Sequence, residues 1–223
     1  MAVGVLTIAY AAYTVVMLAL AVWAFSLFWR RRSIASFTVA LPIALLVWDN
    51  GIVAIGSLLG PGPLLEALSW PRFVGHAVFT PIWIVTAFEY ARRAGAPRLQ
   101  GMASKAAEWV LYAAMVALGV LRSVILLRMV VERQAELVYY TNGGGFPGPP
   151  IPALVMVVVL IACGWSVSRQ TGWRWMLFGG VVMFVAAAVP TSMVGFWLSN
   201  TGEVVLSAAL VATERFMQRR ESA

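Results

Sequence analysis

Residues 34–59 read IASFTVALPIALLVWDNGIVAIGSLL, an apolar run in which Asp49 is the only charged residue. The run is longer than the roughly 20 apolar residues that an α-helix needs to cross a bilayer. Asp49 is also the only aspartate of the chain. An ionisable group at membrane depth is costly, so it is usually paired, protonated or used. The run therefore predicts a transmembrane helix with an acid that is either paired or held neutral to donate a proton.

The composition is that of a membrane protein. The chain has 223 residues, of which 61% are hydrophobic and 11% are charged, against roughly 45–50% apolar residues in soluble domains. The first apolar run lacks a basic start and a small-residue cleavage site, so it reads as a spanning helix rather than a signal peptide. We expect residues 1–223 to form one integral membrane domain.

Seven apolar runs separated by helix-breaking residues predict an all-α bundle with seven transmembrane helices. Arg30–Arg32 ends the first run, and the segment Gly60–Pro63 ends the second. A Gly- and Pro-rich stretch at 142–150 separates the fourth run from the fifth. The predicted helices cover about 3–29, 34–59, 72–92, 103–130, 152–168, 173–198 and 203–218.

The basic residues predict the orientation. The net charge of +7 would indicate nucleic-acid binding in a soluble protein, but here the basic residues gather in short loops, as in a positive-inside signal. We therefore expect a multi-pass protein of the cell membrane, with the N-terminus outside, the C-terminus cytoplasmic and no nucleic-acid partner. Twelve of the sixteen basic residues fall on the predicted cytoplasmic side: Arg30, Arg31, Arg32, Arg92, Arg93, Arg98, Lys105, Arg169, Arg174, Arg215, Arg219 and Arg220.

Several common membrane chemistries fail on residue counts. A single histidine, His76, does not provide bis-histidine haem ligation or a multi-histidine zinc site. The only lysine, Lys105, lies at the start of a predicted helix, where it does not suit a retinal Schiff base. The carboxylates are too scattered to hold Mg²⁺. We expect no cofactor and no metal.

Three ionisable residues are the candidate catalytic groups. Asp49 is the candidate general acid, because apolar surroundings favour a neutral carboxylic acid that can protonate an alkene or an epoxide. Asn50 could polarise this acid, and His76 could recharge it. Glu203, at the start of the last predicted helix, is a second candidate. The alternatives are interhelical packing by Asp49 and Asn50, a core histidine, and helix capping by Glu203.

Aromatic residues and one arginine complete the candidate site. Phe73, Phe79 and Trp83 share a helical face with His76, and aromatic rings stabilise carbocations. The alternatives are a packed core stripe and interfacial belts. Arg122 could snorkel, meet an anionic substrate or pair with Asp49, and pairing would leave Asp49 ionised. Four further residues could extend the aromatic lining: Trp48, Tyr112, Phe196 and Trp197.

The chain resembles the small seven-helix membrane terpene cyclases of the non-classical class II type, found in meroterpenoid and indole-sesquiterpenoid pathways. The resemblance rests on size, topology, the segment Trp48-Asp49-Asn50, Glu203 and the segment Pro71–His76. It implies a metal-independent isomerase that starts cyclisation of a prenyl chain with buried acids. In the fungal members, the helix-2 acid is a glutamate and the late acid an aspartate, the reverse of this chain.

Three hypotheses about the function stay open. The preferred hypothesis is protonation-initiated cyclisation of a prenylated, farnesyl-type substrate taken from the membrane lipids, with Asp49 as the general acid. The second is a small transporter or ligand-binding receptor with a proton-coupled polar site open to the outside. The third is a scaffold without small-molecule chemistry, which predicts no sizeable cavity around Asp49.

Overall fold

Eight α-helices and one β-hairpin make up the part of the chain that the computed structural model describes, which is residues 4–144, 150–189, 193 and 195–222. The two strands, β1 (Met129–Gln134) and β2 (Leu137–Asn142), pair antiparallel with Met129 opposite Asn142. The helices are α1 (Val5–Arg31), α2 (Ile34–Leu59), α3 (Pro63–Val78), α4 (Trp83–Arg93), α5 (Met102–Val120), α6 (Ile151–Thr171), α7 (Trp175–Ala188) and α9 (Trp197–Arg220).

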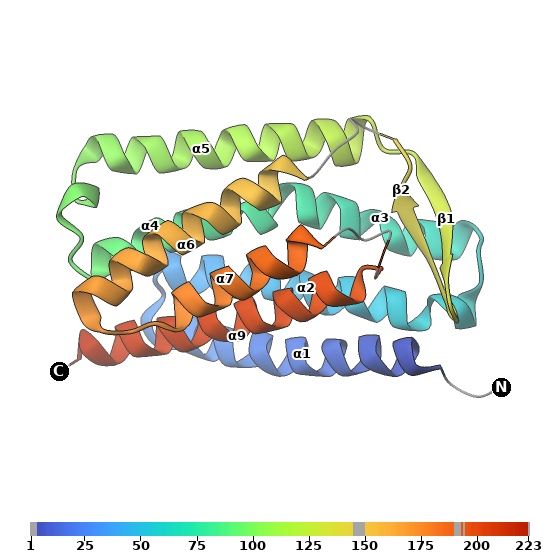
Figure 1. The fold of residues 1–223 in the computed structure, drawn as a ribbon, viewed down its shortest axis with the longest axis horizontal. Helices are drawn as coiled ribbons and strands as arrows, with labels where there is room; N and C mark the ends of the chain where they lie inside the picture. Colours follow the sequence, from blue (N-terminus) through green and yellow to red (C-terminus); the bar gives the residue numbers. More distant parts are fainter. Residues whose placement is uncertain (1–3, 145–149, 190–192, 194, 223) are drawn as a thin grey trace.

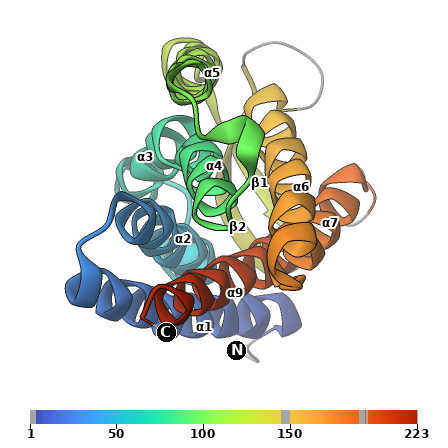
Figure 2. The ribbon, with the colours of Figure 1, turned by 90° about the vertical axis from the view of Figure 1, so that its left-hand side faces the viewer.

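The helices run lengthwise between two ends of the molecule (Figure 1). One end, which we name the hairpin end, carries the N-terminus and the strands β1 and β2. The other end, which we name the arginine end, carries the C-terminus and the C-terminal ends of α1, α4, α6 and α9. In the end-on view, α5 lies at the edge of the bundle, across from α1 and α9 (Figure 2). The basic residues at the ends of α1, α4, α6 and α9 therefore share one end of the fold.

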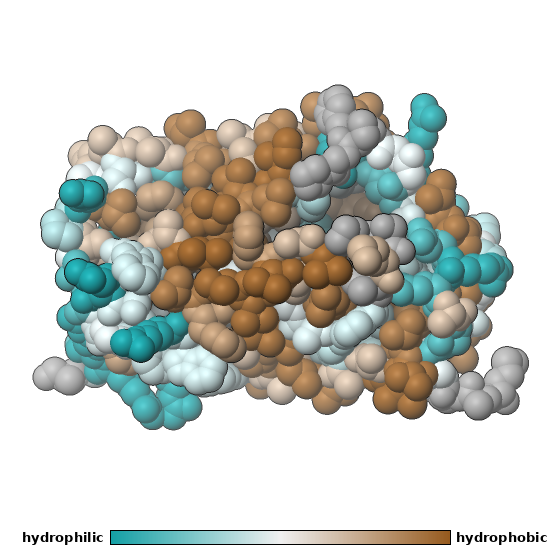
Figure 3. Space-filling view, in the orientation of Figure 1, coloured by the Kyte–Doolittle hydropathy of each residue, from teal (hydrophilic) through white to brown (hydrophobic). Residues whose placement is uncertain are grey.

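The surface is apolar around the middle of the molecule. Figure 3 shows a hydrophobic band between two hydrophilic ends. Within the described residues, four helices are long and apolar enough to cross a membrane, namely α1, α2, the segment Met102–Ile125 and α6. The helix α7 is apolar but shorter. The predicted membrane character is thus supported for these four segments.

Most of the predicted helix positions agree with the structure. The run 34–59 forms α2, which begins after Ser33, whose side chain accepts a hydrogen bond from the amide of Ser36 (3.1 Å), as N-cap residues do. The predicted helices 3–29, 152–168 and 203–218 correspond to α1, α6 and α9 with shifted ends. The prediction 173–198 was too long, because α7 ends at Ala188 and Val189 is extended. Residues 190–192 and 194 lie outside the described residues.

The third run, predicted as one helix over 72–92, is two helices with a break. The first, α3, begins at Pro63, and a short 3₁₀ turn at Thr80–Ile82 separates it from α4. Pro81 causes the break, since proline has no amide hydrogen and disfavours helical conformation in the residue before it. The hydroxyl of Tyr112 donates to the carbonyl of Val78 (3.2 Å), which stabilises the interrupted end of α3.

The fourth run, predicted as a helix over 103–130, ends earlier than expected. After α5 comes one π-helical segment, Leu121–Ile125, and the chain then forms β1 and β2. β-Branched and aromatic residues make up four of the six positions of β2, and β1 contains Val130 and Val131; such residues favour extended structure. The run was extended to 130 because its hydrophobicity continues, although its helical conformation does not.

The hairpin closes one end of the bundle over α2. Leu137 and Tyr139 pack with Tyr10 of α1, while Val138 and Tyr140 pack on the other side with Leu65 of α3. These four side chains of β2 are buried. The strand therefore fills the space between α1, α2 and α3 above Asp49.

The hairpin turn also caps α1. The carboxylate of Glu136 accepts hydrogen bonds from the amides of Leu6 (2.6 Å) and Thr7 (3.1 Å). These amides have no partner within the helix, and the helix dipole favours a negative charge there. Hydrogen bonds from backbone amides, its own and those of Thr7 and Leu6, hold the pKa of Glu136 below its usual value. The contact joins residues about 130 positions apart and holds the hairpin on the bundle.

Gly56 gives the hairpin room to lie against α2. A Cβ atom at this position would lie 2.0 Å from the carbonyl oxygen of Val138, and a backbone atom of a packed strand cannot move cheaply. We expect Gly56→Ala to lower the free energy of unfolding by about 1–3 kcal/mol, measured by SDS titration in mixed micelles. The matched control is Gly51→Ala in the same helix, where the nearest atom to a Cβ, in Thr14, lies at 3.6 Å. Equal losses in both variants would contradict this account of the contact.

Candidate functional site

Asp49 lies in a buried cluster of charged groups between α2 and α3. The Nε atom of Arg72 lies 2.6 Å from Oδ1 of Asp49, and Nε2 of His76 lies 3.5 Å from the same oxygen. Arg72 and His76 are four residues apart in α3, so they project from one face of the helix. The Asp49 side chain is only 7% exposed. Asp49 is therefore one half of a buried ion pair.

Arg72 is held by the hairpin as well as by Asp49. Its Nη1 atom donates to the carbonyl oxygen of Tyr140 in β2 (3.3 Å), and its guanidinium lies 6.0 Å from the ring centre of Phe73. These contacts hold the guanidinium in an orientation that points toward Asp49. The hairpin thus takes part in the site as a support for its cation.

Glu203, in α9, lies near these charged groups, but it forms no ion pair with Arg72 or His76 among the described residues. Its Oε2 atom is buried and has no hydrogen-bond partner among the described residues. The charges of His76, Asp49 and Arg72 act on this carboxyl group. Glu203 lies in the second turn of α9, which begins at Trp197, so the helix-capping alternative does not hold. A buried carboxyl oxygen without a partner is costly in a native structure, so the position of Glu203 calls for an explanation.

Two asparagines fix α9 against α2 beside the cluster. Nδ2 of Asn200 donates to Oδ1 of Asn50 (2.9 Å), and Nδ2 of Asn50 donates to the carbonyl of Leu46 (2.8 Å). Both asparagines are buried. Asn200 and Glu203 are three residues apart, so this bond also orients the face of α9 that carries Glu203. The side chain of Asn50 therefore joins α2 to α9. The side-chain partner of Asp49 is Arg72 and not Asn50.

A small cavity adjoins the cluster. It has a volume of about 10 Å³, which is room for about one water molecule. The side chain of His76 is 40% exposed at the surface between α2 and α3. A group outside the bundle can therefore reach the imidazole, whereas Asp49 lies behind it. The cavity is lined by Leu45, Leu46, Asp49, Pro71, Arg72, Gly75, His76 and Thr80.

The structure places two of the three candidate residues, Asp49 and His76, in contact, with Glu203 within range of their charges. The cation beside Asp49 is Arg72, whereas the sequence suggested Arg122, which lies in the π-helical segment after α5. In the sequence, Arg72 stands out only as part of the segment Pro71–His76 that carries the resemblance. The spacing of four residues between Arg72 and His76 is the sequence feature that predicts both side chains on one face of a helix.

The predicted aromatic lining is not a continuous wall around Asp49. The break at Pro81 separates Phe73 and Phe79 from Trp83, which is 1% exposed within the main core. The indole of Trp48 is turned outward and donates to the carbonyl of Leu68 (3.1 Å). Three further residues lie elsewhere: Tyr112 against the end of α3, Phe196 against Tyr139, and Trp197 at the start of α9.

The arrangement can exchange protons. It combines an imidazole, a carboxyl group whose Oε2 atom has no hydrogen-bond partner in the described part of the chain, an ion-paired carboxylate and a guanidinium. Imidazole and carboxyl groups are the usual general acids and bases of proteins. Among the described residues, no group of three His, Cys, Asp or Glu side chains is arranged to hold a metal ion.

Comparison with known proteins shows no family for this chain. No protein-family model matches it, and no curated protein sequence matches it.

Proposed function

We propose that the chain crosses the cell membrane seven times, with the N-terminus outside and the C-terminus in the cytoplasm. Four helices have the length and composition of spans, and the alternating directions of all segments in Figure 1 are compatible with three more. The three more are the α3–α4 unit, α7 and α9. The arginine end carries the basic residues that the positive-inside rule assigns to the cytoplasm. On this topology, the Asp49 cluster lies toward the outer side.

We propose that the cluster of Asp49, Arg72, His76 and Glu203 is an acid–base site for a lipophilic substrate. The observation that carries the proposal is the buried Oε2 of Glu203, which has no hydrogen-bond partner among the described residues and lies within the range of the charge of His76, a histidine open to the surface. In a chain of this composition, that surface faces lipid, so the reactant comes from the bilayer.

The reaction we propose is the protonation-initiated cyclisation of a prenylated substrate, as the resemblance to membrane terpene cyclases implies. Glu203 replaces Asp49 as the proton donor, because the guanidinium of Arg72 holds Asp49 as a carboxylate. The π electrons of a terminal alkene form a C–H bond with the proton, which leaves a carbocation at the other alkene carbon. The π electrons of the remaining alkenes attack this cation in turn and close the rings. Loss of a proton to His76 ends the reaction, and His76 returns a proton to Glu203. The product is an isomer of the substrate.

The test is turnover of a farnesylated aromatic substrate by membranes that contain the protein. We expect a product of unchanged mass and changed retention, carrying deuterium when the reaction runs in D₂O. Glu203→Gln should reduce the rate by about 10²–10⁴-fold, because it removes a general acid. Glu66→Gln, an exposed acid of α3, is the control and should retain the rate. Full activity of Glu203→Gln would refute this assignment.

Proton-coupled transport is the second candidate, and the size of the cavity favours it. A volume of about 10 Å³ admits water or a proton, whereas pockets for small molecules hold roughly 300–1,000 Å³. So small a cavity is also what the scaffold hypothesis predicts. A prenyl chain enters only if α2 and α3 separate. Proteoliposomes with a trapped pH dye distinguish the two functions: proton movement that depends on Glu203, without any isomeric product, would support transport.

A further inference from the structure

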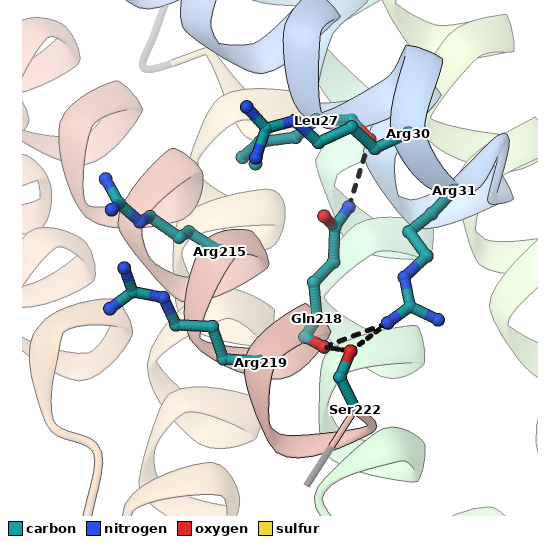
Figure 4. A pocket seen from close by; sticks show the side chains of 7 residues that line it. All are labelled: Leu27, Arg30, Arg31, Arg215, Gln218, Arg219 and Ser222. Atoms are coloured by element: carbon teal, nitrogen blue, oxygen red, sulfur yellow. Dashed lines mark hydrogen bonds between the residues drawn. The ribbon is translucent and has the colours of Figure 1, made fainter.

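A pocket with four arginines opens at the arginine end, far from the Asp49 cluster. It holds about 350 Å³ and lies between the C-terminal parts of α1 and α9. In Figure 4, the guanidinium groups of Arg30, Arg215 and Arg219 extend in one direction, and that of Arg31 turns toward Ser222. The lining residues are Leu27, Arg30, Arg31, Arg215, Gln218, Arg219 and Ser222.

The positive charge of this pocket is not balanced by nearby acids. The two acids of this part of α9, Glu214 and Glu221, both accept hydrogen bonds from Arg93 of α4 (2.6 Å each). Among the described residues, no carboxylate pairs with Arg30, Arg215 or Arg219 at ion-pair distance. Four like charges around one cavity repel one another, so an anion that enters the pocket relieves this repulsion.

Two of the four arginines are held in place. Arg31 donates through Nη2 to the carbonyl of Gln218 (3.3 Å) and to the hydroxyl of Ser222. The guanidinium of Arg215 lies 5.8 Å from the ring centre of Trp23 in α1. The side chain of Gln218 donates to the carbonyl of Leu27 (3.1 Å), which joins α9 to α1 under the pocket. The walls are therefore ordered before any ligand binds.

We propose that this pocket binds the phosphate of an anionic phospholipid headgroup. Arginine forks match phosphate oxygens in pairs, and basic pockets between membrane helices on the cytoplasmic side are sites for such headgroups. The pocket is formed by the C-terminal parts of α1 and α9, at the end that the proposed topology places at the cytoplasmic face of the membrane. The exposed rings of Trp29 and Trp175 belong to helix ends on the same side, as interfacial aromatics do. This proposal rests on the proposed membrane topology and does not depend on the acid–base site.

The test is lipid binding to the purified full chain in micelles, measured by native mass spectrometry with dioctanoyl phosphatidylglycerol and dioctanoyl phosphatidylcholine. The anionic lipid should bind more tightly. The double variant R215Q/R219Q should weaken it about twenty-five-fold, which is roughly five-fold for each arginine near an anionic headgroup. The variant R215K/R219K keeps the charge and should recover most of the affinity.

The matched control is R169Q/R174Q, which removes two exposed arginines from the same end of the molecule but outside the pocket. It should change the affinity less than three-fold by our estimate, since these charges act only over a screened distance. Equal weakening by both double variants would show a diffuse charge effect and overturn the proposal. Equal binding of the two lipids would also overturn it. If inorganic diphosphate binds more tightly than the lipid, the pocket serves a soluble anion and the lipid assignment is wrong.

Discussion

Replacement of Arg72 by glutamine is expected to lower the free energy of unfolding by about 3–5 kcal/mol. The Asp49 side chain is 7% exposed and its Oδ1 atom lies 2.6 Å from Nε of Arg72. Without the guanidinium, a buried carboxylate loses its cation, and His76 at 3.5 Å is too distant to replace it fully. The hydrogen bond from Arg72 to the carbonyl of Tyr140 is lost as well. SDS titration in mixed micelles, followed by tryptophan fluorescence, measures the change.

The double variant Asp49→Asn/Arg72→Gln separates charge from packing. It removes both charges, so it should recover most of the stability that Arg72→Gln loses. Arg133→Gln is the control for loss of one positive charge at the hairpin end, because Arg133 is exposed on β1. If the double variant is no more stable than Arg72→Gln, the ion pair is not the reason for the loss.

The second large effect is expected at the arginine end. Arg93→Gln should lower the free energy of unfolding by about 3 kcal/mol or more. Its Nη1 atom lies 2.6 Å from Oε2 of Glu214, a residue that is only 1% exposed. Glu214 keeps hydrogen bonds from Ser36 (2.6 Å) and Gln218 (2.7 Å), but neutral donors do not cancel a buried charge.

The control and the rescue are measured by the same titration. Arg93→Gln/Glu214→Gln should be more stable than Arg93→Gln, since no unpaired carboxylate remains. Arg98→Gln lies on the same side of the molecule and is exposed, so it should change the stability by less than about 0.5 kcal/mol. A loss in Arg98→Gln equal to that in Arg93→Gln would show that the effect is not specific to the buried pair.

The sequence predicted the positions of most helices, because long apolar runs and their breakers are local features. It failed where a local rule competed with the hydrophobic pattern. Pro81 lies inside an apolar run, and its helix-breaking effect outweighs the hydrophobicity of its neighbours. The hairpin was missed because its turn, Ala135-Glu136, lacks the glycine or asparagine typical of two-residue turns. Ala135 nevertheless adopts a positive φ of 49°, held by the contact of Glu136 with α1.

The candidate site was predicted in part. Asp49, His76 and Glu203 are rare ionisable residues in apolar surroundings, so residue counts alone drew attention to them. The aromatic wall was not predictable, because it assumed one unbroken helix from Phe73 to Trp83. The role of Arg72 depends on where α3 begins, and the structure places that start at Pro63, nine residues before the predicted one.

The linear chain established an apolar protein with one aspartate at membrane depth, and it showed that this acid is either paired or held neutral. It did not identify the partner. A salt bridge forms only when two charged atoms come within about 4 Å. The partner of Asp49 is therefore decided by which helix packs beside α2 and by the rotation of that helix, α3, about its axis. From the sequence alone, Arg122 and Arg72 are equally suitable cations for Asp49. In the folded chain, it is Arg72 that projects toward Asp49 and contacts the hairpin. The folded structure thereby makes Asp49 a paired carboxylate and leaves Glu203 as the acid whose buried oxygen has no hydrogen-bond partner among the described residues.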